Sequence, residues 1–142
     1  MRVMILEDDL NDLHIAADAA RAMGIKDIEA FMWLAPAQKW LDEAIKGQKP
    51  LPDAIILDLA VGCESGYELL RAWHKAKLNS KIHMIVWSHL ESRNREVCEL
   101  FNVDAYVGKW EGAIALRDAL RRVKSGHHEL AAKERLRSLR RS

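Results

Sequence analysis

Cysteine, proline and long apolar runs are all scarce in this chain of 142 residues, which has two cysteines and three prolines. Two cysteines without a Cys-x-x-Cys spacing favour neither a disulfide framework nor a structural zinc site. The longest apolar runs, over residues 54–57 and 84–87, are far shorter than the roughly 18–20 residues that a membrane-spanning helix needs. Acidic residues from position 7 onward also come too early for a signal peptide. We therefore expect a cytoplasmic protein without a membrane segment.

An excess of charge of either sign is also lacking, because 22 basic residues face 21 acidic ones. A net charge of +1 gives the chain no overall attraction for nucleic acid or for an anionic membrane. Residues 127–142 do carry five basic and two acidic side chains, a local surplus of three positive charges. This segment has no aromatic side chain that could stack on bases, so nucleic-acid binding is not expected.

The chain does contain a regular alternation of two kinds of segment. Short apolar, strand-like runs occur at residues 2–6, 27–32, 54–57, 82–87 and 105–108. Segments with apolar residues at helical spacing occur at 13–23, 36–46, 67–73, 93–101 and 113–123. Asn11 or Asp12 is expected to cap the first helix, and Ala113 to lie on the inner face of the fifth. Parallel strands need crossover connections, so the pattern predicts an α/β fold, a doubly wound five-stranded parallel sheet.

The length suits a single domain, which we expect to span residues 1–124. After Ser125 the sequence is rich in helix formers but has few apolar residues. Residues 125–142 are therefore predicted to form a basic, partly frayed helical tail.

Charged and polar residues stand at the carboxyl ends of four predicted strands. Glu7 and Asp8 follow the first, Asp58 the third, Ser88 the fourth and Lys109 the fifth. In doubly wound sheets, ligands bind beyond these strand ends. Clustered carboxylates repel one another unless a cation neutralises them, and their hard oxygens suit Mg²⁺. Each residue alone could simply cap a helix or lie at a solvated strand end, so only the combination indicates a magnesium site.

Four segments, MILEDD, PDAIILDLAVGCESGYELL, VWS and AYVGKW, resemble the receiver domain of bacterial two-component response regulators. The resemblance covers about residues 1–124 and implies a flavodoxin-like (βα)5 fold of the single-domain, CheY-like type. It implies that Asp58 accepts the phosphoryl group, with Asp8 as a direct Mg²⁺ ligand. Glu7 would reach the metal through water, and Ala60 would offer its backbone carbonyl.

The same resemblance implies a switch that responds to phosphorylation. Ser88 corresponds to the switch hydroxyl, Lys109 to the lysine that pairs with the phosphoryl group, and Tyr106 to the switch aromatic. The implied partners are a sensor histidine kinase or a phosphotransfer protein and a downstream protein target, with a homodimer as an open alternative. No enzymatic turnover is expected beyond Mg²⁺-dependent self-phosphorylation from a phosphodonor and slow self-dephosphorylation.

Three departures from the family pattern bear on this switch. Gly62 replaces a usual proline and is expected to loosen its loop. Trp110 replaces the proline that normally follows the lysine, so a trans peptide bond and a re-routed loop are expected. The spacing between Ser88 and Lys109 is one residue short, which leaves Trp87 as the alternative occupant of the switch position.

Two other functions compete with a phosphorylated receiver. A degenerate receiver would act as a phosphorylation-independent interaction module. A haloacid-dehalogenase-like phosphatase would need a second acid two residues after its nucleophile, and Ala60 stands at that position. The sequence therefore disfavours the phosphatase and leaves the degenerate receiver as the main alternative.

Overall fold

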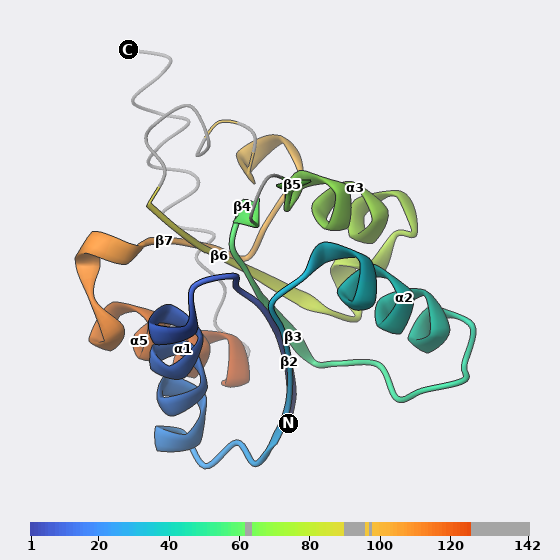
Figure 1. Ribbon diagram of the computed structural model, residues 1–142. Helices are drawn as coiled ribbons and strands as arrows, with labels where there is room; N and C mark the ends of the chain where they lie inside the picture. Colours follow the sequence, from blue (N-terminus) through green and yellow to red (C-terminus); the bar gives the residue numbers. More distant parts are fainter. Residues whose placement is uncertain (62–63, 90–95, 97, 126–142) are drawn as a thin grey trace.

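A parallel sheet forms the centre of the molecule in the computed structural model, which describes residues 1–61, 64–89, 96 and 98–125 (Figure 1). Its five strands lie in the order β2-β1-β3-β6-β7, and every neighbouring pair is parallel. The strands are β1 (Arg2–Leu6), β2 (Asp27–Phe31), β3 (Ala54–Leu57), β6 (His83–Ser88) and β7 (Ala105–Gly108). The predicted doubly wound α/β fold is confirmed.

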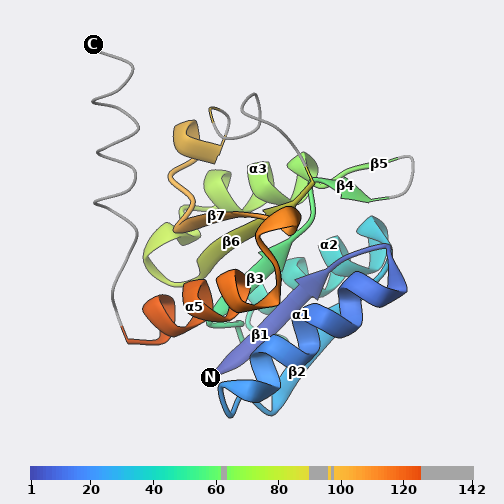
Figure 2. The ribbon, with the colours of Figure 1, turned by 90° about the vertical axis from the view of Figure 1, so that its left-hand side faces the viewer.

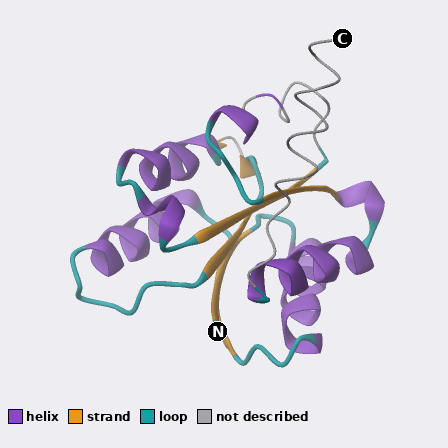
Figure 3. Cartoon of the chain, turned by 180° about the vertical axis from the view of Figure 1, so that it is seen from behind, coloured by secondary structure: helices purple, strands orange, loops and turns teal. Residues whose placement is uncertain are grey.

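Helices cover both faces of this sheet, as the view from behind in Figure 3 makes clear. They are α1 (Leu10–Ala22), α2 (Leu34–Ile45), α3 (Tyr67–Lys75) and α5 (Ala113–Lys124), with short 3-10 turns η1 (Leu78–Ser80) and η2 (Lys109–Glu111). Apolar side chains of α1 and α5 pack on one face, and those of α2 and α3 pack on the other. Figure 2 shows α1 and α5 side by side on their face of the sheet. No helix within the described ranges is long and apolar enough to cross a membrane.

The two core layers follow from the alternation of side chains along each strand. In β1, Val3 and Ile5 pack toward α1 and α5, whereas Met4 and Leu6 pack toward α2 and α3. All four are fully buried. A strand covered on both faces must be apolar at every position, which explains the continuous apolar runs of the sequence.

Three local predictions are corrected. Helix α1 begins at Leu10, so its cap is Asp9, whose Oδ1 accepts a hydrogen bond from the backbone N–H of Asp12 at 2.9 Å. Helix α2 begins at Leu34, two residues before its expected start at Pro36. Ala113 is exposed, because the buried face of α5 consists of Leu116, Ala119, Leu120 and Val123.

A short hairpin between β3 and α3 was not predicted. It consists of β4 (Ala60–Val61) and β5 (Glu64–Ser65), which pair antiparallel. Two-residue strands have too little sequence to show any period. The predicted fourth helix lies partly outside the described residues, and the predicted tail does so beyond Ser125.

Candidate functional site

The register of the sheet brings the strand ends together. Leu6 pairs with Leu57, so Glu7 and Asp58 leave neighbouring strands side by side. The backbone N–H of Asp58 donates to the carbonyl of Leu6 at 3.0 Å, which continues the ladder beyond β3. At the other side of β3, Ser88 of β6 pairs with Gly108 of β7, the residue directly before Lys109.

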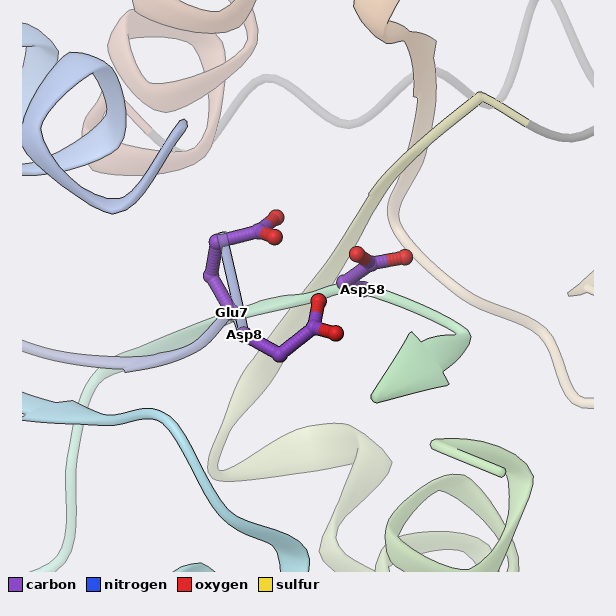
Figure 4. Close-up of side chains that lie close together, drawn as sticks. All are labelled: Glu7, Asp8 and Asp58. Carbon is purple, nitrogen blue, oxygen red and sulfur yellow. The ribbon is translucent and has the colours of Figure 1, made fainter. Parts of the chain in front are cut away.

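Three carboxylates form a compact cluster at this edge. Glu7, Asp8 and Asp58 each present an oxygen within 4.8 Å of the others (Figure 4). Glu7 and Asp58 are buried, and Asp8 is half-buried. Burial strengthens the repulsion between these negative charges, so the cluster needs nearby positive charge.

Lys109 supplies part of that charge from the end of β7. Its Nζ lies 2.6 Å from Oε2 of Glu7 and 3.1 Å from Oδ2 of Asp58. A third carboxylate, Asp12 in the first turn of α1, places Oδ2 at 2.9 Å. The Lys109 side chain is only 4% exposed, so these are ion pairs with little screening by water.

The contact between Lys109 and Glu7 is close but poorly directed. Among the described residues, Oε2 of Glu7 has no partner that meets the angular requirement of a hydrogen bond, although Nζ is within ion-pairing distance. This contact is therefore close without being a hydrogen bond, and it is ionic only while Glu7 is deprotonated. It leaves hydrogen-bonding or metal-binding capacity on a buried carboxylate oxygen, which is unusual unless another group completes the site.

Burial raises the pKa of Glu7 to about 8, because the charged form loses its hydration. The nearby negative charge of Asp58 acts in the same direction, while Lys109 opposes both. Burial alone would lower the pKa of Lys109, but the three carboxylates around its ammonium together hold that pKa above its usual range. Lys109 is therefore a permanent cation, whereas Glu7 takes up a proton when no other cation is near.

The residues fit a divalent metal ion. Four carboxylates, counting Asp12, lie at this edge of the sheet, and three of them pair with one ammonium group, so negative charge remains in excess. Carboxylate oxygens are the ligands that Mg²⁺ prefers, and a cation beside Glu7 would favour its ionised form. Ala60, whose carbonyl is the fourth predicted ligand, lies in β4 close after Asp58. Its role as a ligand stays a prediction.

Ser88, rather than Trp87, faces the aspartate. The Ser88 hydroxyl lies 3.4 Å from Oδ1 of Asp58, which also accepts the backbone N–H of Ala60 at 3.0 Å. Trp87 is buried in the opposite layer, with its ring centre 5.2 Å from Nζ of Lys109. Strand alternation decides this placement, because neighbouring residues of β6 point to opposite faces.

Tyr106 and Trp110 lie on the neighbouring strand and its loop. Tyr106 is half-buried and packs against the core layer of α2 and α3. No cis peptide bond occurs in the described part of the chain, so the Lys109–Trp110 bond is trans as expected. The indole of Trp110 lies against Gly108, where any side chain would collide with it, and Trp110 is 72% exposed. Gly62 lies outside the described residues.

Asp12 is the site residue that the sequence reasoning missed, since it was considered only as a helix cap. The signal was Asp9, the third residue after the end of β1. Asp9 can cap a helix that begins one residue later, and Asp12 then falls in the first turn at the same edge of the sheet.

Comparison with known proteins gives a uniform result at the level of structure. No family model matches the chain, and no curated protein matches its sequence. A response regulator receiver domain from Rhodospirillum rubrum superposes with a TM-score of 0.72 at 19% identity, over 83% of this chain and 89% of that one. A two-component response regulator from Cytophaga hutchinsonii gives 0.72 at 22% identity, over 87% and 96%.

A plant protein is similar to the same extent. The receiver domain of the histidine kinase CKI1 from Arabidopsis thaliana, complexed with Mg²⁺ and BeF₃⁻, gives a TM-score of 0.69 at 21% identity, over 87% of this chain and 89% of that one. At such identities a likeness establishes the fold. Together with the strand order and the acidic edge, it shows that this chain has the flavodoxin-like fold of CheY-like response-regulator receiver domains.

Proposed function

We propose that this chain accepts a phosphoryl group on Asp58 and thereby switches a protein-interaction surface. The donor would be a sensor histidine kinase or a phosphotransfer protein, and the receiver of the signal a downstream protein. One observation carries the proposal: a buried Asp58 whose two oxygens face a lysine and a serine, beside two further carboxylates.

The chemistry requires that negative charge be neutralised. An oxygen of Asp58 attacks phosphorus, the bond from phosphorus to the donor atom breaks, and the donor keeps the electron pair. Mg²⁺ held by Glu7, Asp8, Asp58 and the carbonyl of Ala60 would neutralise the transferring oxygens. Lys109 adds a fixed ammonium on the side of Oδ2, at 3.1 Å.

The product carries the signal because it changes charge at a buried position. An acyl phosphate adds about 1.5 to 2 negative charges at neutral pH. Ser88, with its hydroxyl 3.4 Å from Oδ1 of Asp58, can donate a hydrogen bond to a phosphoryl oxygen after a small movement. Tyr106 on β7 is the neighbouring aromatic that would follow. The surface expected to change comprises β7, α5 and the segment at residues 93–101.

Two structural neighbours support this reading through their bound or modified states. The CKI1 receiver was solved with Mg²⁺ and BeF₃⁻. The cyanobacterial phytochrome response regulator RcpA, with a TM-score of 0.68 at 19% identity over 82% of this chain and 86% of that one, was solved in phosphorylated form. The bound Mg²⁺ and BeF₃⁻ and the phosphorylation belong to those two proteins. They motivate a phosphorylation assay on this chain.

Incubation with acetyl phosphate or phosphoramidate and Mg²⁺ tests the proposal directly. We expect a phosphorylated species by intact mass and by phosphate-affinity electrophoresis, lost in Asp58→Asn and in chelator. Asp53→Asn is the matched control, because Asp53 precedes the same strand at its opposite end. Failure of the wild-type protein to gain phosphate, or gain by Asp58→Asn, would contradict the proposal.

The degenerate receiver remains the second candidate, favoured by the exposed indole of Trp110 at the edge of the site. A constitutive interaction module would need such a permanent contact surface and no phosphate. The same assay separates the two functions, since a folded protein that binds Mg²⁺ in a tryptophan fluorescence titration but never gains phosphate belongs to the second class.

A further inference from the structure

Asp12 is the acidic residue of the site that the proposed function leaves without a role. Its Oδ2 lies 2.9 Å from Nζ of Lys109, across 97 residues of sequence. Asp12 is outside the carboxylate cluster that fits a metal ion. Its side chain is 21% exposed, against 1% for Glu7 and 7% for Asp58.

The ammonium of Lys109 is shared among three carboxylates. It donates hydrogen bonds to Asp12 and Asp58 and lies 2.6 Å from Oε2 of Glu7. A phosphoryl oxygen must therefore compete with these carboxylates for the charge of the ammonium.

The metal determines which carboxylate still holds the ammonium when a phosphoryl group arrives. Mg²⁺ would replace the ammonium as the counter-ion of Glu7 and Asp58, which belong to the carboxylate cluster, whereas Asp12 lies outside that cluster. Asp12 is also exposed enough to be hydrated, and Nε2 of the exposed His89 lies 3.8 Å from the same Oδ2. Asp12 would thus be the carboxylate that still pairs with Lys109, and the one that can release it at least cost.

We propose that Asp12 is a positioning residue that holds the Lys109 ammonium in the resting protein and competes with the phosphoryl group for it. This inference rests on the proposed function. It also assigns Asp12 a second effect, before phosphorylation. Mg²⁺ must enter beside an ammonium of like charge, and Asp12 stabilises that ammonium as it moves away from Glu7 and Asp58.

The effects of Asp12 on the affinity for BeF₃⁻ and on the affinity for Mg²⁺ have opposite signs, so the two can be distinguished by measurement. Isothermal titration calorimetry would give the affinity for Mg²⁺ alone and the affinity for BeF₃⁻ at saturating Mg²⁺. For Asp12→Asn we expect BeF₃⁻ to bind about tenfold more tightly, the effect of freeing one charge-assisted hydrogen bond. We expect Mg²⁺ alone to bind about threefold more weakly, because the Lys109 ammonium is then held less firmly away from the metal site.

Asp18→Asn is the matched control. Asp18 lies on the same helix and loses the same charge, but its side chain is 75% exposed and pairs with Arg21. Both affinities should remain at the wild-type values. Circular dichroism on heating shows whether Asp12→Asn is folded, and Asp12→Ser, with the same expected signs, replaces it if it is not.

Repeating the Asp12→Asn substitution in a Lys109→Ala protein tests whether Asp12 acts through Lys109. In Lys109→Ala, the Asp12→Asn change should no longer weaken Mg²⁺ binding by the same factor. An equal loss in both backgrounds would show that Asp12 acts only as a nearby charge and would overturn the proposal.

Weaker binding of both ligands to Asp12→Asn, or unchanged BeF₃⁻ binding, would also overturn the inference about Asp12 while leaving phosphorylation of Asp58 intact. If the wild-type protein binds Mg²⁺ but no BeF₃⁻, the proposed function fails, and the role of Asp12 fails with it.

Discussion

At the scale of single residues, the site depends on how much negative charge one ammonium can balance. Lys109 was expected only as a contact for the phosphoryl group, yet it is the counter-ion of three carboxylates before any phosphate arrives. Glu7 shows the consequence. It is fully buried, and its pKa is raised to about 8 despite the adjacent ammonium.

This shift predicts how stability changes with pH in the absence of metal. Folded Glu7 keeps its proton up to about pH 8, because its pKa is raised there, whereas the unfolded chain releases it near the ordinary pKa of 4.5. The folded state therefore binds more protons between these values, and the free energy of unfolding should fall as pH rises from about 5 to 8. Urea unfolding in chelator at a series of pH values measures the slope.

Glu7→Gln should remove most of that slope, because glutamine does not titrate. Glu68→Gln on α3 is the control, since Glu68 is exposed and pairs with Arg71, and it should retain the slope. A wild-type protein that becomes more stable over this pH range in chelator would show that Lys109 keeps Glu7 ionised.

At the scale of elements, the connection from β3 to α3 packs closely against the backbone of Asp58. Gly66 stands at the start of α3, and its N–H donates to the carbonyl of Leu59 at 2.8 Å. A Cβ at this position would collide with the backbone carbonyl of Asp58. Helix α3 can therefore approach the phosphoacceptor strand this closely only with glycine at position 66.

Gly66→Ala should consequently affect both stability and phosphorylation. Overpacking of this kind costs about 1–3 kcal/mol of unfolding free energy. A displaced nucleophile should also react about tenfold to a hundredfold more slowly with acetyl phosphate. Urea unfolding and the initial rate of phosphorylation measure the two effects.

Gly24→Ala provides the comparison for this variant. Its Cβ would meet no atom within 4 Å, but its φ of +80° is unfavourable for alanine. It should lose about 1 kcal/mol of stability and keep the wild-type rate. A Gly66→Ala protein with a normal rate would mean that α3 shifts without moving Asp58.

At the scale of the whole molecule, the acidic edge should couple metal binding to folding. Two of the clustered carboxylates follow β1 and the third follows β3, so the site exists only when the sheet is assembled. A ligand that binds only the folded state at 100 times its Kd stabilises it by about 2.7 kcal/mol. We therefore expect Mg²⁺ to raise the thermal midpoint and EDTA to reverse the gain.

Differential scanning calorimetry at constant ionic strength tests this expectation. Asp8→Asn should reduce the gain strongly, because it removes one of the three clustered carboxylates. An equal rise with NaCl at matched ionic strength, or an undiminished rise in Asp8→Asn, would show that Mg²⁺ acts by general screening and not at the acidic edge.

The layered sheet and the charged residues at its edge could be predicted from the sequence. Continuous apolar runs are a local property of strands covered on both faces, and Ala54–Leu57 and Ala105–Gly108 have the expected bounds. Because the ends of parallel strands share one edge, Glu7, Asp8 and Asp58 could be grouped without coordinates.

Which of these residues touch depends on how the elements pack together. Strand alternation placed Ser88 toward Asp58 and Trp87 in the opposite layer. The packing of α1 against the sheet brought Asp12 to Lys109, a contact over 97 residues that no local pattern encodes. Such contacts depend on how the helices pack on a shared core, and that packing depends on all the buried side chains together.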